Sequence, residues 1–182
     1  WSIAENSNKY YISTVNGCYT SDSTFQWIEN NNGLNGAVIN DIKTRDNEVW
    51  VCTSFGLYKS VDKGAHFQKL LDGFYLKIML SESAIYVCGS KAFLVSEDAG
   101  NTWNNIVLPL LIEWEEVVDA DFGGGYAYII TCCEQGNKMH RFEMNSKHWD
   151  EIEGTDIDIV YYVSASDSLV VLSCFSSSMV TY

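Results

Sequence analysis

The chain has 182 residues, 47% of them hydrophobic, and its 11 basic and 24 acidic residues give a formal net charge of −13. This charge opposes extended contact with phosphates or anionic lipid head groups, so it argues against a nucleic-acid partner. A core of ordinary size is expected, whereas the longest apolar run, 106–112, is interrupted by Pro109 and falls well short of the ~18 residues of a membrane span.

A repeat emerges when the chain is followed from its start. A strand is expected around 10–12, and a weak copy of the repeat occupies 17–28. The segments 56–70 and 92–106 then align without gaps at an offset of 36 residues, and a second weak copy covers 141–152. The aromatic residues Trp27, Phe67, Trp103 and Trp149 take the same place in the four copies. A period near forty residues is typical of four-stranded propeller blades.

Strand-like runs fill the space between the copies. The predicted pairs are 37–42 with 49–53, 75–80 with 85–89, and 117–122 with 127–132, and the last repeat starts again with 157–163, 169–174 and 179–182. The repeats therefore cover approximately 1–32, 33–72, 73–112, 113–154 and 155–182 of a single domain. The stretch before 10–12 is expected to be too short for a preceding strand, and the last repeat lacks its outer strand.

The turn of each clear copy carries the pattern Ser-x-Asp-x-Gly-x-Thr-Trp, complete at 96–103 and nearly so at 60–67. Each Asp is expected to bond the backbone amide two residues on, and each Gly to supply a positive φ. This pattern resembles the Asp-box, or BNR repeat, of sialidases, sortilin-type receptors, some xyloglucan hydrolases and a photosystem assembly factor, all of them propellers. The residues that carry the resemblance, and for which a structural rather than catalytic role is predicted, are Ser60, Asp62, Gly64, Phe67, Ser96, Asp98, Gly100 and Trp103.

The fold class predicted from these observations is all-β. It is a β-propeller of four-stranded antiparallel blades with Asp-box turns, either a ring of four or five blades or, as we prefer, part of a larger ring.

The six cysteines predict a compartment. Cys52, Cys88, Cys132 and Cys174 lie near the end of the second strand of a blade, where neighbouring sheets are too far apart for disulfides, so we expect buried thiols. Free thiols and the absence of any Asn-x-Ser/Thr sequon favour the cytoplasm or another reducing compartment. Secretion is the alternative.

Two groups of residues are candidate sites. Cys132, Cys133, His140 and His148 could suggest zinc, but a turn at 135–136 would pair Cys132 with Met139 and His140 with Thr131, on opposite faces, so no metal is predicted. Glu113, Trp114, Glu115, Glu116 and Asp119 lie in the longest connection between repeats and are the candidate partner-binding residues, against the alternative of a solvated loop.

Function is predicted from the repeats and from the lack of a catalytic constellation. The chain is expected to be a non-catalytic scaffold for one or more protein partners, as one subunit or domain of a larger assembly, with no cofactor and with its oligomeric state open. The alternative is a glycan-processing hydrolase or a sortilin-like receptor ectodomain. A sialidase of this resemblance needs three arginines, and the chain has only Arg45 and Arg141.

Overall fold

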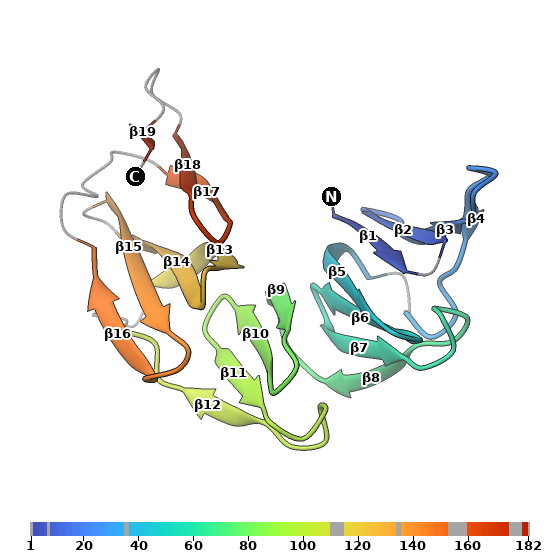
Figure 1. The fold of residues 1–182 in the computed structure, drawn as a ribbon, viewed down its shortest axis with the longest axis horizontal. Coiled ribbons are helices and arrows are strands. Elements are labelled where there is room, and N and C mark those ends of the chain that lie inside the picture. The colour runs from blue at the N-terminus through green and yellow to red at the C-terminus, as the bar shows by residue number, and fades with distance from the viewer. Residues whose placement is uncertain are drawn as a thin grey trace. The chain divides into compact units, whose positions relative to one another are not determined.

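The chain is all-β in the part that the structure describes (Figure 1). The computed structural model describes residues 2–6, 8–34, 37–109, 115–133, 136–152, 160–174 and 180–181. They belong to two compact units, Trp1–Ile106 and Val107–Tyr182. Every sheet is antiparallel, with strands that follow one another in chain order.

The first unit contains three four-stranded sheets. The first sheet consists of β1 (Ile3–Asn6), β2 (Lys9–Thr14), β3 (Gly17–Ser21) and β4 (Ile28–Glu29). The second consists of β5 (Ile39–Arg45), β6 (Glu48–Thr53), β7 (Gly56–Ser60) and β8 (Gln68–Leu71). The third consists of β9 (Tyr75–Leu80), β10 (Ile85–Gly89), β11 (Phe93–Ser96) and β12 (Asn104–Ile106).

The second unit continues the pattern with two sheets. The fourth sheet consists of β13 (Glu116–Gly123), β14 (Tyr126–Cys133), β15 (Gly136–Glu143) and β16 (His148–Glu151). The fifth has three strands among the described residues, β17 (Val160–Ala165), β18 (Val170–Cys174) and β19 (Val180–Thr181). The two glycines between β13 and β14, Gly124 and Gly125, both have positive φ, as a two-residue hairpin turn requires.

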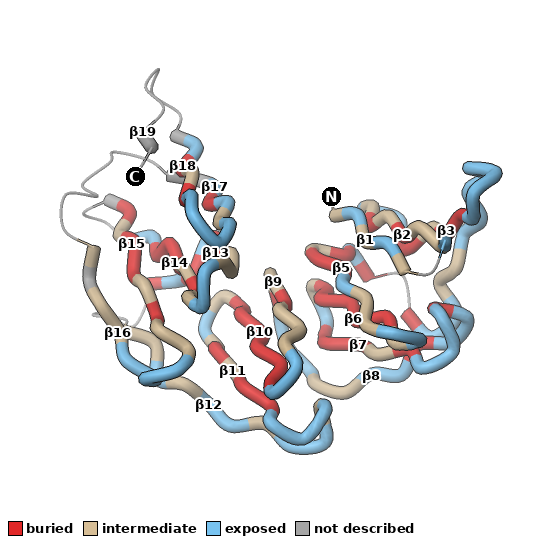
Figure 2. Tube along the Cα trace, viewed as in Figure 1, coloured by how far each residue is buried: buried red, intermediate tan, exposed pale blue. Residues whose placement is uncertain are grey.

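Burial explains why these sequences form strands. The second strand of a sheet is the most apolar, and β10 is buried over its whole length, whereas the short outer strands β4, β8 and β12 are exposed or half-buried (Figure 2). Consecutive sheets contact each other through their first and second strands, β1 and β2 on β5, β5 and β6 on β9, and β13 and β14 on β17. Apolar side chains between the sheets therefore form the core, and the outer hairpins lie at its rim.

A register shift recurs in the first strand of several sheets. It falls between Ile39 and Asp41 in β5, and between Val117 and Asp119 in β13. In both strands the aspartate after the shift is buried and accepts a hydrogen bond from the first strand of the next sheet. Asp41 Oδ2 lies 3.1 Å from the amide nitrogen of Ile78, and Asp119 Oδ2 lies 2.9 Å from that of Val163. These two carboxylates clamp adjacent sheets.

The predicted fold class is confirmed, with strands close to the expected positions and one correction at the start of the chain. Each observed sheet lies within one of the five predicted repeat ranges, while the single-domain assignment stays a prediction. The expectation that no strand could precede 10–12 was wrong, because β1 needs only four residues and a two-residue connection to pair with β2.

The cysteines also require a correction. Cys52 and Cys88 are buried free thiols at equivalent positions, opposite the residue that follows the register shift. In the fourth sheet that position belongs to Ile130, and Cys132, two residues later, is exposed. The side chain of Cys174 lies outside the described residues. Spacing in the sequence concealed the difference because the strands of the fourth sheet are longer.

Candidate functional site

The turn that follows β7, here called turn 62–66, is held by a serine and an aspartate. The Ser60 hydroxyl donates to Asp62 Oδ1 at 2.7 Å and accepts the amide of Gly64 at 2.9 Å. Asp62 Oδ1 also accepts the amide of His66 at 2.9 Å. Lys63 and Gly64 have φ of 58° and 82°, so two successive left-handed residues reverse the chain.

Turn 98–102, after β11, repeats this geometry. The Ser96 hydroxyl donates to Asp98 at 2.8 Å and accepts the amide of Gly100 at 2.8 Å, while Asp98 Oδ1 accepts the amide of Thr102 at 2.8 Å. The aspartate therefore reaches the amide four residues on, and the expectation of two residues on was wrong, because the serine hydroxyl serves the glycine amide instead. The shorter reach occurs in the weak first copy, where Asp22 accepts the amide of Thr24 at 2.8 Å.

Both aspartates are stabilised in the ionised form. The Thr102 hydroxyl and amide lower the pKa of Asp98 to about 2. The His66 ring, 2.6 Å from Asp62 Oδ2, and the Ser60 hydroxyl lower the pKa of Asp62 below its ordinary value. His66 was expected to be solvated, and its side chain is indeed largely exposed, although it is engaged by Asp62. The pKa shifts of the two aspartates arise from the bonds that build the turns.

Turn 62–66 rests on the first sheet. A Cβ placed on Gly64 would lie 3.1 Å from the Tyr11 ring, so glycine is needed for the close approach. The carbonyl oxygen of Lys63 accepts the Tyr11 hydroxyl at 3.2 Å and Lys9 Nζ at 3.0 Å, and Lys9 also lies over the Tyr11 ring. An aromatic ring and a cation of one sheet thus hold the left-handed turn of the next.

Turn 98–102 rests on the second sheet in the same way. A Cβ on Gly100 would lie 2.5 Å from the Trp50 ring and 3.7 Å from Leu70 Cδ1. Lys59 Nζ lies 4.5 Å from the Trp50 ring centroid and donates to the Ala99 carbonyl oxygen at 3.4 Å. Glu48 holds both side chains in place, because it forms an ion pair with Lys59 at 2.6 Å and accepts a hydrogen bond from the indole N–H of Trp50 at 3.0 Å.

Phe67 and Trp103 close the two turns and pack inward. Phe67 is buried in the cluster between the first two sheets, and Trp103 packs on the cluster between the second and third sheets. The structure thus brings the eight predicted turn residues together as two separate groups of four, one around Asp62 and one around Asp98. Their structural role is taken up below as a proposal.

The faces that receive the turns were not foreseen. Tyr11 and Trp50 were missed, as were Lys59 and Asp41. A signal was present in the sequence, because the second strand of four sheets carries an aromatic residue at the same position. That position is the one after the residue that pairs with the end of the third strand or its equivalent, namely Ser21, Ser60, Ser96 or Phe142. These four aromatic residues are Tyr11, Trp50, Tyr86 and Tyr128.

The acidic residues at the start of β13 differ in how far they are buried. Glu115 is buried and accepts the Thr131 hydroxyl at 2.6 Å, and Asp119 is the buried clamp to β17. Both carboxylates are buried in this unit, and the partner-binding role of the segment stays a prediction. Glu116 is exposed, whereas Glu113 and Trp114 lie outside the described residues.

The predicted pairing of the zinc candidates was out of register by two residues. Cys132 pairs with Asn137, and His140 pairs with Ile129. A shift of two residues leaves each side chain on the same face, so Cys132 and His140 still point to opposite faces. Within the described ranges, no group of three or more His, Cys, Asp or Glu side chains is arranged to hold a metal ion.

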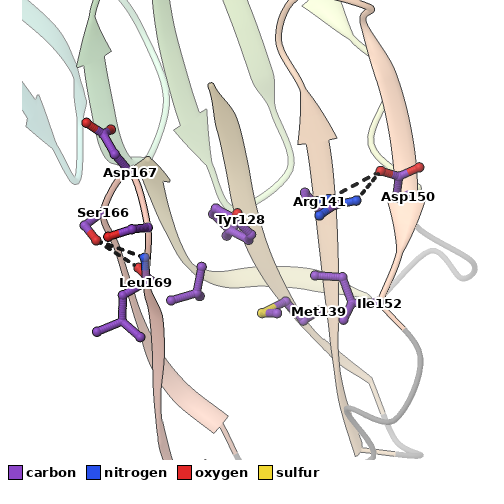
Figure 3. A pocket seen from close by; sticks show the side chains of 10 residues that line it. Tyr128, Met139, Arg141, Asp150, Ile152, Ser166, Asp167 and Leu169 are labelled. Carbon is purple, nitrogen blue, oxygen red and sulfur yellow. Dashed lines mark hydrogen bonds and ion pairs between the residues drawn. The ribbon is translucent and has the colours of Figure 1, made fainter. Parts of the chain in front are cut away.

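A pocket of about 610 Å³ opens inside the second unit, between the fourth sheet and the β17–β18 loop (Figure 3). Its lining includes the side chains of Tyr128, Met139, Ile152 and Arg141. Arg141 forms an ion pair with Asp150 at 2.9 Å, which raises the pKa of the guanidinium, and its charge lies 4.7 Å from the Tyr126 ring centroid. The pocket lining thus combines apolar side chains with Arg141 and two carboxylates, Asp150 and Asp167.

Comparison with known proteins identifies the fold. No protein-family model and no curated protein matches the sequence. YCF48 bound to D1 peptide matches with a TM-score of 0.75 at 14% identity, over 98% of this chain and 61% of that one. The extracellular domain of the BT4673 system of B. thetaiotaomicron has a TM-score of 0.74 at 14% identity, over 95% of this chain and 26% of that one. The Cps50 (Swd1) β-propeller domain of Myceliophteria thermophila has a TM-score of 0.70 at 9% identity, over 97% and 67%.

These matches show that the chain has a β-propeller fold, as its repeat predicted. It spans about a quarter of the length of the BT4673 extracellular domain and 61% of YCF48. The part of the chain that the structure describes holds no helix whose length and apolarity would suit a bilayer crossing.

Proposed function

We propose that this chain is a non-catalytic propeller module that binds a protein partner. The observation that carries the proposal is the exposure of large apolar side chains at the β3–β4 connection and the start of β4. Phe25 and Ile28 are each more than 60% exposed, and Trp27, between them in sequence, is 39% exposed. Exposed apolar groups gathered on one short segment are typical of protein contact surfaces.

The polar residues that might have served catalysis support the same proposal. Asp62 and Asp98 hold their turns, Asp41 and Asp119 clamp sheets, and Glu115 bonds Thr131. The role of the eight Asp-box residues is therefore proposed to be structural. Arg45 pairs with Glu48 in the first unit and Arg141 with Asp150 in the second, so neither supports the sialidase-like alternative.

The comparisons supply a precedent within the fold. YCF48, which has the same fold, is bound to a peptide in its solved structure. We infer that this chain likewise offers its loops and rim to a polypeptide, as one subunit or domain of a larger assembly.

Affinity purification with matched variants tests the proposal. Phe25 has φ of 55°, which Asn tolerates, so the double variant F25N/I28S removes apolar surface without straining the turn. We expect the wild-type chain to enrich a defined partner and the double variant to lose it, while V107S, which removes another exposed apolar side chain, retains it. Turnover of a glycan substrate by the wild-type chain, with no partner enriched, would contradict the proposal.

The compartment is tested through the thiols. Burial raises the pKa of Cys18 to about 12 and that of Cys52 well above its ordinary value, so neither thiol is reactive in the folded chain. We expect titration of the denatured, unreduced protein to find all six cysteines free, and a count of two or fewer would end the argument for a reducing compartment. The similar structures do not support a cytoplasmic location, since they include an extracellular domain, which agrees with the secreted alternative.

A further inference from the structure

Two Asn-Gly pairs lie among the described residues, Asn16–Gly17 in the β2–β3 hairpin and Asn32–Gly33 in the connection from β4 to β5. An asparagine followed by glycine can lose its side-chain amide without an enzyme, because glycine has no side chain to hinder attack by its own main-chain nitrogen. The two pairs share this chemistry, so the surrounding structure decides which of them reacts. A third pair, Asn35–Gly36, lies outside the described residues.

The main chain of Asn16 is held at both its amide and its carbonyl. The amide donates to the Thr14 hydroxyl at 3.1 Å, and the carbonyl oxygen accepts the side-chain amide of Asn31 at 3.1 Å. Gly17 is buried and pairs with Thr14 in the ladder of β2 and β3. A Cβ placed on Gly17 would lie 2.1 Å from Asn31 Oδ1, so this glycine is closely surrounded. Its nitrogen is therefore shielded from base and fixed in place.

Asn32 and Gly33 are instead the central residues of an exposed turn, which the Leu34 amide closes on the Asn31 carbonyl at 2.9 Å. Among the described residues, neither the side chain of Asn32 nor the amide of Gly33 has a hydrogen-bond partner. The carbonyl oxygen of Asn32 accepts the amide of Phe67 at 2.9 Å. The attacking nitrogen and the side chain that it would attack are thus both accessible to solvent.

We propose that Asn32 is a site of spontaneous deamidation in the folded chain and that Asn16 is protected. Base takes the proton of the Gly33 amide, and the nitrogen attacks Cγ of Asn32. The new N–Cγ bond replaces the Cγ–Nδ2 bond, and Nδ2 takes up a proton through water and leaves as ammonia. Water then opens the cyclic imide. Addition at Cγ gives aspartate, and addition at the main-chain carbonyl carbon gives isoaspartate, so water is the only co-reactant and no atom is oxidised or reduced.

The isoaspartate product changes the contact with Phe67. Its main chain runs through the former side chain and is longer by one methylene, so the carbonyl that accepted the Phe67 amide no longer lies in the chain. Gly33 has no room to compensate, since a Cβ placed on it would lie 2.0 Å from the Phe67 carbonyl oxygen. Phe67 is buried in the cluster between the first two sheets, so the reaction at an exposed turn reaches a core residue.

Mass spectrometry of the complete 182-residue chain tests the proposal. The chain is incubated at mildly alkaline pH, and its peptides are fragmented to find which residue gains the mass difference between an NH2 and an OH group. We expect the gain at Asn32 to accumulate at least about tenfold faster than at Asn16, where Gly17 must leave the ladder and two further hydrogen bonds must open. In guanidinium chloride the two residues should react at similar rates, because only the folded structure distinguishes them.

Matched variants and the isolated product complete the test. N32S removes a side chain without a hydrogen-bond partner among the described residues and should lower the total mass gain of the folded chain, whereas N16S should leave it unchanged. The isoaspartate form, separated by chromatography, should lose hydrogen-exchange protection at the amide of Phe67. It should keep protection at the amide of Gly64, which the Ser60 hydroxyl holds.

Three outcomes overturn the assignment: equal rates at Asn16 and Asn32 in the folded chain, no gain at Asn32 over the time in which the denatured chain reacts, or a total gain in N32S as fast as in the wild type. Unchanged protection of the Phe67 amide in the isoaspartate form would overturn the structural consequence.

Discussion

Turn 98–102 of the first unit lies on Trp50 and Lys59, whereas the second unit carries Tyr128 and Arg141 at the same register beside a pocket. Lys59 lies 4.5 Å from the ring centroid of Trp50, its cross-strand partner, while Arg141 lies 4.7 Å from that of Tyr126. The same register therefore does not place the two cations on equivalent rings. Glu48 behind Lys59 and Asp150 beside Arg141 show how each sheet fixes its own cation.

The largest expected effect is the difference in stability cost between replacing Gly100, which lies against Trp50, and replacing Gly125, which has no neighbour within 4 Å. G100A combines a left-handed φ of 92° with a Cβ 2.5 Å from Trp50, so we expect a loss of about 3 kcal/mol in unfolding free energy. Gly125 has a similar φ of 85° with nothing within 4 Å, so G125A should cost only the strain of about 1 kcal/mol. Urea denaturation measures both. Equal losses would show that docking does not matter.

The sheet clamp should make the two units behave alike. D41N keeps the shape of the side chain but can place an NH2 group opposite the amide of Ile78, where the carboxylate oxygen accepted a hydrogen bond. We expect a loss of about 2 kcal/mol in unfolding free energy. D119N should do the same at the amide of Val163. Hydrogen exchange at these two amides reports each clamp directly. Unchanged protection of the amide in either variant would show that the carboxylate does not hold the two sheets together at that position.

The cations should differ in what they stabilise. K59M loses the ion pair with Glu48, the ring contact and the bond to the Ala99 carbonyl, so we expect a loss of about 1 kcal/mol in unfolding free energy. R141M loses a half-exposed ion pair and a ring contact but no bond to a turn among the described residues, so its cost should stay under about 0.5 kcal/mol. A larger cost for R141M in thermal unfolding would show that the ion pair with Asp150 stabilises the unit more than an exposed pair does.

The smallest effect is a dependence on pH. The pKa of Asp98 is about 2 in the folded chain against 3.8 as its ordinary value, so its contribution is complete above pH 4 and is lost as the pH falls through 2. D98N should therefore flatten the decline of unfolding free energy between pH 4 and 2, whereas E116Q, at an exposed acidic residue outside the turns, should not. Identical slopes for the wild type and D98N would contradict the bonding described for turn 98–102.

The sequence predicted the repeat well because its turn residues act locally. Serine, aspartate and glycine at fixed spacing close a hairpin within eight positions, and alternating apolar runs form strands wherever they have neighbours. Two of the details that failed involve register. The pairing of Cys132 and the equivalence of the cysteines both changed by two residues, which no local pattern could detect because a two-residue shift leaves the faces unchanged. The aspartate's reach failed for another reason, since the serine hydroxyl accepts the glycine amide.

What the amino-acid order determined by itself is the propeller fold, since each sheet is encoded by a segment of about forty residues with its own turn. What only the tertiary structure decided is the use of those sheets: Asp41 and Asp119 as clamps, Trp50 and Lys59 as the surface on which the next turn lies, and Tyr128 and Arg141 as part of a pocket lining. The physical reason is that these roles depend on contacts between successive sheets, and residues some forty positions apart meet only when the sheets pack.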